Sequence, residues 1–263
     1  MIDILVSTFG ESKPLVESLH KNLPHLCKLK VVHQQPEATV KKKYTSLGFD
    51  YYTSDTIGLS KSRNIALSLV SNEIGLIADD DVSYIEGFEN TIVNAFETFS
   101  EADIIVFRIV TPNGRPYKQY WKDLGWLGKR HIFKPSSIEM AFRCKSIQDA
   151  KLQFDENFGL GARFPLGEEA IFISDALKKG LKIRCVPLDI VVHPYESTGK
   201  IYTNKNMIAR GAQLARIFGY PAFFVNFAFF IKLCLNEKKI LKISLLPIMF
   251  KGTIQYFKEI KNS

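Results

Sequence analysis

The stretch Ile74-Gly75-Leu76-Ile77-Ala78-Asp79-Asp80-Asp81-Val82 is an apolar run that ends in three consecutive carboxylates. Such a run, followed by turn residues and by a helical pattern over 87–99, predicts a buried strand in an α/β sheet. Three adjacent acids at the end of a strand repel one another unless something positive binds there. A divalent cation that carries phosphates would fit, and the alternative is that the acids cap the next helix in solvent.

The segments on either side alternate between strand and helix patterns. Residues 2–8, 29–33 and 49–52 are strand candidates, and Ser12 with Pro14 is expected to open a helix whose leucines share one face. Further strands are expected at 102–110, 182–186 and 189–192. Strands joined by single helices favour a mostly parallel sheet flanked by helices, so the predicted fold class is α/β.

Positive charge is concentrated in the last quarter of the chain. Residues 199–263 carry eleven Lys or Arg against two Glu, which gives +9, whereas the whole chain carries +8. The Phe-rich segment 218–235 and the apolar segment 240–250 lie among these lysines. We expect interfacial helices on an anionic membrane surface, with a helical pair that covers the core as the alternative. So much apolar surface disfavours nucleic acid as the partner.

The cysteines and the start of the chain indicate the compartment. Cys27, Cys144, Cys185 and Cys234 have no CxxC or metal-type spacing, which favours a reducing compartment and no zinc site. Met1 leads directly into a strand-like segment without a basic region or a long apolar region. This argues against a cleaved signal peptide, so a cytoplasmic location is expected.

A basic turn precedes the acidic strand end. In Gly58-Leu59-Ser60-Lys61-Ser62-Arg63-Asn64, Ser60 is the expected helix N-cap. Lys61, Arg63 and Asn64 then lie in the first turn, where cations oppose the helix dipole. An anionic ligand would compensate for them, and a plain surface turn is the alternative.

A glutamate pair opens a later helix. Helix-dipole complementarity alone would explain Glu168 and Glu169, but nearby glycines such as Gly167 let the backbone approach a ligand, so a carboxylate base is a competing role. His193 follows a strand, where a lone histidine is more often structural unless it has a metal partner. The aromatic and basic loop 111–135, which holds Trp121 and Trp126, suits either sugar stacking or a local hydrophobic clamp.

In their order and separations, the basic turn, Asp79-Asp80-Asp81 and Gly167-Glu168-Glu169 resemble the inverting family 2 glycosyltransferases of the GT-A fold. The resemblance covers roughly residues 1–200. It implies that Asp79 and Asp81 form a DxD motif that holds Mg²⁺ or Mn²⁺ and the nucleotide-sugar diphosphate, with His193 as a further metal ligand. It also implies that Glu169, or else Glu168, is the general base. The implied donor contacts are Thr8, Lys61, Arg63, Asn64, Asp79 and Asp80.

Two features depart from the family pattern. His33-Gln34-Gln35-Pro36-Glu37 replaces the usual Asp-Asp-Gly-Ser that helps to hold the nucleotide base. Glu169 stands where the family has Asp, which lengthens the base by one methylene and leaves the choice between Glu168 and Glu169 open.

The predicted organisation is a GT-A domain over 1–200 and a helical, basic, membrane-peripheral tail over 201–263. The predicted function is transfer of a sugar, from a UDP-sugar as the expected donor, to a hydroxyl of a lipid-linked glycan in cell-surface polysaccharide synthesis. The enzyme would lie at the inner face of the cell membrane. A nucleotidyltransferase is one alternative, although Ser7-Thr8-Phe9-Gly10-Glu11 is a poor triphosphate-binding loop. A non-catalytic scaffold on the same fold is the other.

Overall fold

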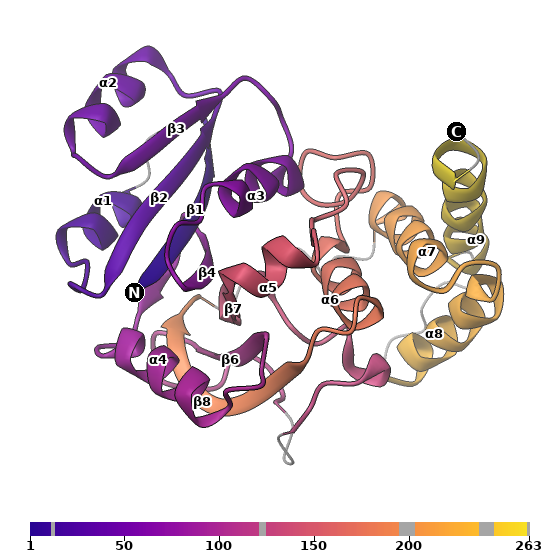
Figure 1. Ribbon diagram of the computed structural model, residues 1–263. Helices are drawn as coiled ribbons and strands as arrows, with labels where there is room; N and C mark the ends of the chain where they lie inside the picture. Colours follow the sequence, from indigo (N-terminus) through magenta and orange to yellow (C-terminus); the bar gives the residue numbers. More distant parts are fainter. Residues whose placement is uncertain (12–13, 121–124, 195–202, 237–244, 262–263) are drawn as a thin grey trace.

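The computed structural model describes residues 1–11, 14–120, 125–194, 203–236 and 245–261. Within these ranges the chain forms an eight-stranded sheet with the order β3-β2-β1-β4-β7-β6-β8-β5 (Figure 1). The strands are β1 (Ile2–Phe9), β2 (Cys27–Gln34), β3 (Asp50–Ser54), β4 (Ile74–Asp79), β5 (Ser83–Tyr84), β6 (Ile104–Val110), β7 (Met140–Arg143) and β8 (Ile183–Val192).

The sheet is mixed and mostly parallel, as predicted. β1 pairs in parallel with β2 and β4, β2 with β3, and β6 with β8. The four-residue strand β7 runs antiparallel between β4 and β6, and β5 pairs antiparallel with β8. In the β1–β4 register Ser7 lies opposite Asp79, so both strands end at the same edge and bring Thr8 close to Asp80.

Helices cover both faces of the sheet, and each face has its own apolar core. α1 (Pro14–Lys21), α2 (Ala38–Ser46) and α4 (Phe88–Thr98) pack on one face, where Tyr44 and Ile92 are fully buried. On the other face lie α3 (Leu59–Ser68), α5 (Cys144–Asp149), α6 (Glu168–Lys178) and α7 (Asn204–Phe218). Two 3₁₀ turns, η1 (Lys129–His131) and η2 (Ser137–Glu139), precede β7.

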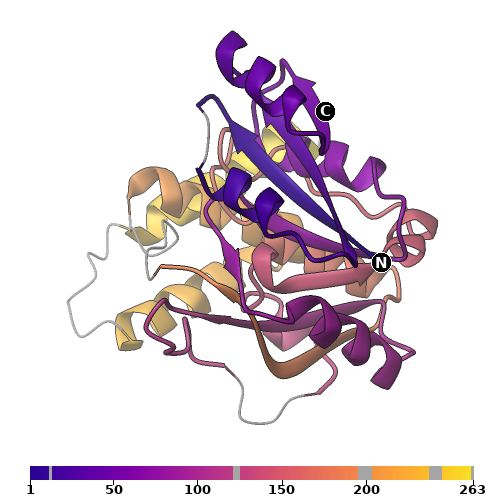
Figure 2. The same ribbon diagram turned by 90° about the vertical axis from the view of Figure 1, so that its left-hand side faces the viewer.

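The C-terminal helices α7, α8 (Ala222–Asn236) and α9 (Leu245–Tyr256) gather at the end of the molecule away from β3, and α9 ends in a π-helical turn, Phe257–Lys261 (Figure 1). In Figure 2 they lie behind the N-terminal strands. In the described part of the chain, no helix is long and apolar enough to cross a membrane.

Glycines allow the backbones of α7 and α9 to touch. A Cβ on Gly211 would collide with the carbonyl of Met249, and a Cβ on Gly252 would collide with that of Ile208. The buried Thr253 hydroxyl donates to the Gly211 carbonyl at 2.9 Å and accepts from Asn226 Nδ2 of α8 at 2.8 Å. These buried hydrogen bonds fix all three helices against one another.

Residues on both sides of position 200 belong to one apolar core. Ala212 and Leu214 of α7 are fully buried in the same cluster as Ile171 and Ile173 of α6. The proposed division of the chain at residue 200 stays a prediction.

Some sequence predictions need correction. Ser60 is not the N-cap of α3, because the helix begins at Leu59 after Gly58, and the Ser60 hydroxyl donates instead to the Phe158 carbonyl at 2.5 Å. The two strands expected over 182–192 are one strand, β8, whose pairing with β6 is irregular near Arg108. The predictions for Ser12, for Trp121 and for 240–244 of the second apolar segment lie outside the described residues.

Candidate active site

A cavity of about 830 Å³ opens at the edge where β4 and β8 end, and it is large enough for a small-molecule substrate. Its lining includes seven polar side chains that five different segments supply: Arg63 from α3, Asp79 and Asp81 from the end of β4, Ser137 from η2, Glu168 and Glu169 from α6, and His193 after β8. The structure therefore brings the acidic triplet region, the glutamate pair and the histidine to one cavity.

Arg63 links the two acidic groups of this cavity. Its side chain is only 3% exposed; Nη2 donates to Asp79 Oδ1 at 2.9 Å and to Ser137 Oγ at 2.8 Å, while Nη1 donates to Glu168 Oε1 at 3.3 Å. Burial lowers the pKa of Arg63, but the charges of Asp79 and Glu168 outweigh this effect and the pKa is raised. The guanidinium stays charged and offsets two carboxylates that burial would otherwise destabilise.

The two glutamates have different surroundings. Burial, and then the charge of Glu169, raises the pKa of Glu168 to about 7, against the opposing effect of Arg63. Glu169 is half-buried and accepts a hydrogen bond from the Ser137 hydroxyl at 3.4 Å. Glu168 is thus held by Arg63, whereas Glu169 presents the more accessible carboxylate to the cavity.

The three aspartates at the end of β4 take separate partners. Asp79 is bound by Arg63, and Asp80 Oδ2 accepts a 2.6 Å hydrogen bond from Thr8 Oγ1. Asp81 Oδ2 lies 3.4 Å from His193 Nε2. The hydrogen bond with Asp81 raises the pKa of His193 in spite of partial burial.

Asp81 and His193 can serve as two ligands of one divalent ion. Adjacent ligand atoms on Mg²⁺ or Mn²⁺ lie about 3 Å apart, close to the observed separation of 3.4 Å. His193 Nδ1 donates to the Pro194 carbonyl at 2.7 Å, which holds the neutral ring in the tautomer that leaves Nε2 for a metal. Asp79 does not join them: no three His, Cys, Asp or Glu side chains of the described residues are grouped to hold a metal ion.

Four predicted donor contacts lie off the lining of this cavity. Thr8 and Asp80 form a hydrogen bond with each other, and neither lines the cavity. Asn64 is tied to Phe154, since its Nδ2 donates to the carbonyl at 3.0 Å and its Oδ1 accepts from the amide at 2.8 Å. Lys61 is half-buried on α3 and is absent from the lining.

Sequence reasoning missed several lining residues. Ser137 carried no motif, although it bridges Arg63 and Glu169. Gln213 of α7 is 1% exposed and donates through Nε2 to the Gly167 carbonyl at 3.0 Å. α7 therefore braces the first turn of α6, the glutamate helix that begins at Glu168. The only sequence feature that set α7 apart was its positive charge, and this charge did not identify Gln213 as a residue of the cavity. The aromatic loop contributes Tyr117, whose ring meets that of His193 edge-on with centroids 5.6 Å apart.

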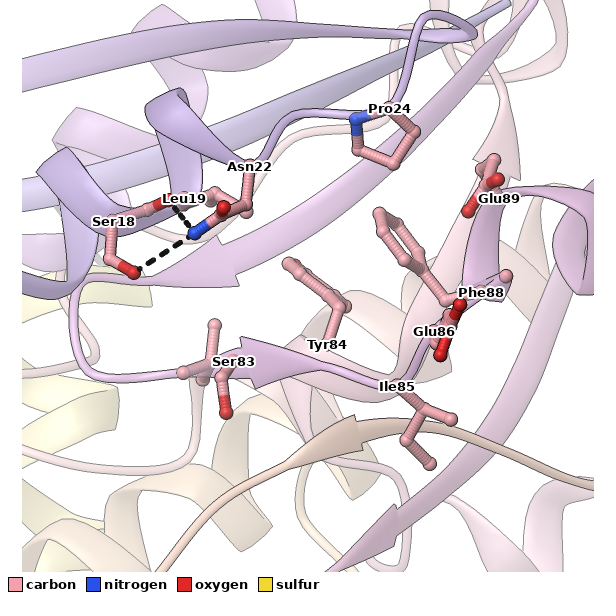
Figure 3. A pocket seen from close by; sticks show the side chains of 12 residues that line it. Ser18, Leu19, Asn22, Pro24, Ser83, Tyr84, Ile85, Glu86, Phe88 and Glu89 are labelled. Atoms are coloured by element: carbon pink, nitrogen blue, oxygen red, sulfur yellow. Dashed lines mark hydrogen bonds between the residues drawn. The ribbon is translucent and has the colours of Figure 1, made fainter.

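A second, smaller cavity of about 370 Å³ lies between the end of α1 and the start of α4 (Figure 3). Ser18 and Asn22 lie across from Tyr84 and Phe88, whose rings stack with centroids 4.3 Å apart. None of the predicted site residues lines this cavity. Six of the predicted site residues line the larger cavity instead: Arg63, Asp79, Asp81, Glu168, Glu169 and His193.

Solved structures share this fold. The chain is similar to S. aureus TarS residues 1–349, with 17% identity and a TM-score of 0.63 over 95% of this chain and 80% of that one. The same TarS fragment in complex with UDP matches at 17% identity and TM-score 0.63, covering 98% and 81% of the two chains. Its complex with UDP-GlcNAc matches at 18% identity and TM-score 0.61, covering 95% and 81%.

These likenesses define the class of fold. The chain has the mixed α/β fold of the GT-A-like glycosyltransferases, as the sequence predicted. At such low identity the likeness to TarS concerns the fold alone. No protein-family model matches the sequence, and no curated protein matches it.

Proposed function

We propose that this protein is an inverting glycosyltransferase, related to family 2, that transfers a sugar from a UDP-sugar to an acceptor hydroxyl. One observation carries the proposal: Arg63 joins Asp79, on the predicted donor side of the cavity, to Glu168, beside the predicted base. The fold supports it, because the similar TarS structures include complexes with UDP and with UDP-GlcNAc.

In the proposed reaction, Glu169 removes the proton from the acceptor hydroxyl. The resulting oxygen attacks the anomeric carbon as the bond from that carbon to the UDP oxygen breaks, so a single displacement inverts the configuration. Glu169 suits this role better than Glu168, which is buried and bound to Arg63. Ser137 orients the Glu169 carboxylate through its hydroxyl. Arg63 keeps a positive charge beside Asp79, where the departing diphosphate would lie.

Asp81 and His193 would hold Mg²⁺ or Mn²⁺ in this scheme. When bound, such an ion supplies positive charge that neutralises the diphosphate leaving group. Asp79 would then hold the Arg63 guanidinium in place. The hydrogen bond between Thr8 and Asp80 would fix the backbone that presents Asp81.

We further propose that the acceptor is a lipid-linked glycan of cell-surface polysaccharide synthesis, met at the cytoplasmic face of the membrane. The support is the net charge of +9 over residues 199–263, which favours an anionic surface. α7 from this basic segment also forms part of the cavity wall through Lys205 and Arg210.

The first test is a thermal-shift panel of UDP, GDP, CDP and dTDP, each with and without Mn²⁺. We expect UDP to stabilise the protein most and Mn²⁺ to strengthen the effect. His193→Ala should remove the Mn²⁺ contribution. Absence of any nucleoside diphosphate binding would contradict the proposal.

The second test measures UDP release from UDP-GlcNAc and other UDP-sugars with glycan acceptors. Glu169→Gln should lower turnover by about 100-fold or more while UDP binding persists, because the base is lost and the donor contacts remain. Glu97→Gln, at an exposed position on α4, is the matched control for the change of charge. Full turnover by Glu169→Gln would show that another group is the base.

A further inference from the structure

Helix α8 exposes a continuous apolar stripe. Phe224, Phe227, Ile231 and Leu235 recur at intervals of three and four residues, so they lie on one face of the helix. Phe224 is 82% exposed and Leu235 is 78% exposed. Soluble proteins seldom leave such large side chains in water in a row, and a row of this kind marks a surface that contacts a partner.

The opposite face of α8 is firmly attached to the molecule. Ala222, Asn226 and Phe230 are buried, and Asn226 donates to Thr253 of α9 and to the carbonyl of Ala222, each at 2.8 Å. Phe223 at the start of the helix packs near Phe250, with ring centroids 5.8 Å apart. Because one face is fixed in this way, the stripe cannot turn inward, and its exposure is a property of the folded protein.

The segment of sequence that carries the stripe is rich in positive charge. No Asp or Glu occurs between Glu196 and Glu237, a stretch that includes all of α7 and α8. Lys232 is exposed on α8 beside Ile231, and Lys238, Lys239 and Lys242 follow the helix in the sequence. An apolar stripe flanked by lysines complements a bilayer with anionic headgroups, which accepts the side chains into its interface and attracts the cations.

The same charge disfavours a second copy of the chain as the occupant of the stripe. Two copies that met through α8 would bring together two segments of +9 each. The 15 described residues of α8 extend about 22 Å, which is short of the roughly 30 Å of hydrocarbon that a membrane-spanning helix must cross. A helix of this length and character lies in the plane of the interface.

We propose that the α8 stripe is a membrane-docking surface that lies along the interface of an anionic bilayer. Phe224, Phe227, Ile231 and Leu235 enter the boundary between headgroups and acyl chains, while Lys232 stays at headgroup level. This goes beyond the proposed glycosyltransferase activity by assigning one helix face and one kind of lipid surface to the contact. It does not depend on the protein's being an enzyme.

Vesicle flotation of the full chain tests the proposal without any substrate. We expect the protein to float with vesicles of phosphatidylcholine that contain about one third phosphatidylglycerol, and to bind pure phosphatidylcholine vesicles far more weakly. The double variant Phe224→Ser with Leu235→Ser should reduce binding to the anionic vesicles by about tenfold or more. Leu188→Ser, an exposed apolar residue of β8, is the matched control and should bind as the wild type does. Unchanged thermal unfolding of the double variant shows that it is folded.

Several outcomes would overturn the proposal. These are failure of the wild type to bind anionic vesicles, equal binding to neutral ones, or undiminished binding by the folded double variant. The proposal would also be overturned if sedimentation showed that the wild type is a dimer and the double variant is a monomer, because the stripe would then be an interface between copies. UDP binding is measured separately, so a wild-type protein that binds UDP but fails to bind anionic vesicles rejects the docking surface and leaves the proposed activity standing.

Discussion

Replacing Glu168 with glutamine removes an ionisable group whose titration is linked to folding. The pKa of Glu168 is raised from 4.5 to about 7, because burial and Glu169 disfavour its charged form. The folded protein therefore binds the proton more tightly than the unfolded chain does. The resulting stabilisation is complete below about pH 4.5 and is lost as the pH rises through 7. A difference of this size corresponds to about 3 kcal/mol in the free energy of unfolding.

The glutamine variant keeps an oxygen for Arg63 but cannot titrate. We expect the free energy of unfolding of the wild type, measured by urea denaturation at intervals from pH 4.5 to 8, to fall relative to that of Glu168→Gln by about 3 kcal/mol. Taking the difference between the two proteins removes the contributions of His193 and of other groups that do not interact with Glu168. Glu97→Gln is the control and should run parallel to the wild type. A wild-type-minus-variant difference that stays constant across this range would refute the reasoning.

Three other changes test the packing around the site. Arg63→Met should destabilise the protein by about 3–5 kcal/mol at pH 8, because Asp79 and Glu168 lose their shared cation; urea denaturation showing a loss below 1 kcal/mol would contradict this. Gly211→Ala should lower the melting temperature strongly, because its methyl meets the backbone of α9, whereas Gly128→Ala, with open space around it, should change it little in the same calorimetric scan. A fragment of residues 1–200 should lack cooperative unfolding, since the core on the α3–α6 face loses α7; a sharp calorimetric transition would show that the tail is dispensable.

The sequence predicted the sheet because its strands are either continuous apolar runs or alternating ones. β1, β4 and β6 lie close to the expected residues, and the helix of the glutamate pair begins at Glu168 as expected. β7 was missed because its four residues are too few to show periodicity. The start of α3 was misjudged because Ser60 is a favourable N-cap type, but its hydroxyl is used in a long-range bond to Phe158.

The candidate site was predictable only in part. Asp79, Asp81, Glu168, Glu169 and His193 were grouped through the resemblance of their ordered motifs to the family 2 glycosyltransferases, and the structure brings all five to one cavity. The sequence could not show that Arg63 turns inward to these acids. Its partners lie 16, 74 and 105 residues away, and a basic residue in a first turn gives no sign of burial. The assignment of catalytic, donor and metal roles to these residues stays a prediction.

The brace between Gln213 and Gly167 also determines when the cavity can exist. Arg63 leaves the ribosome 150 residues before Gln213, an interval of roughly 10 s or more at usual rates of synthesis. Until α7 emerges and docks, the glutamate helix lacks the support at its first turn. A nascent or prematurely terminated chain that lacks α7 therefore lacks the part of the cavity wall that Lys205, Arg210 and Gln213 form.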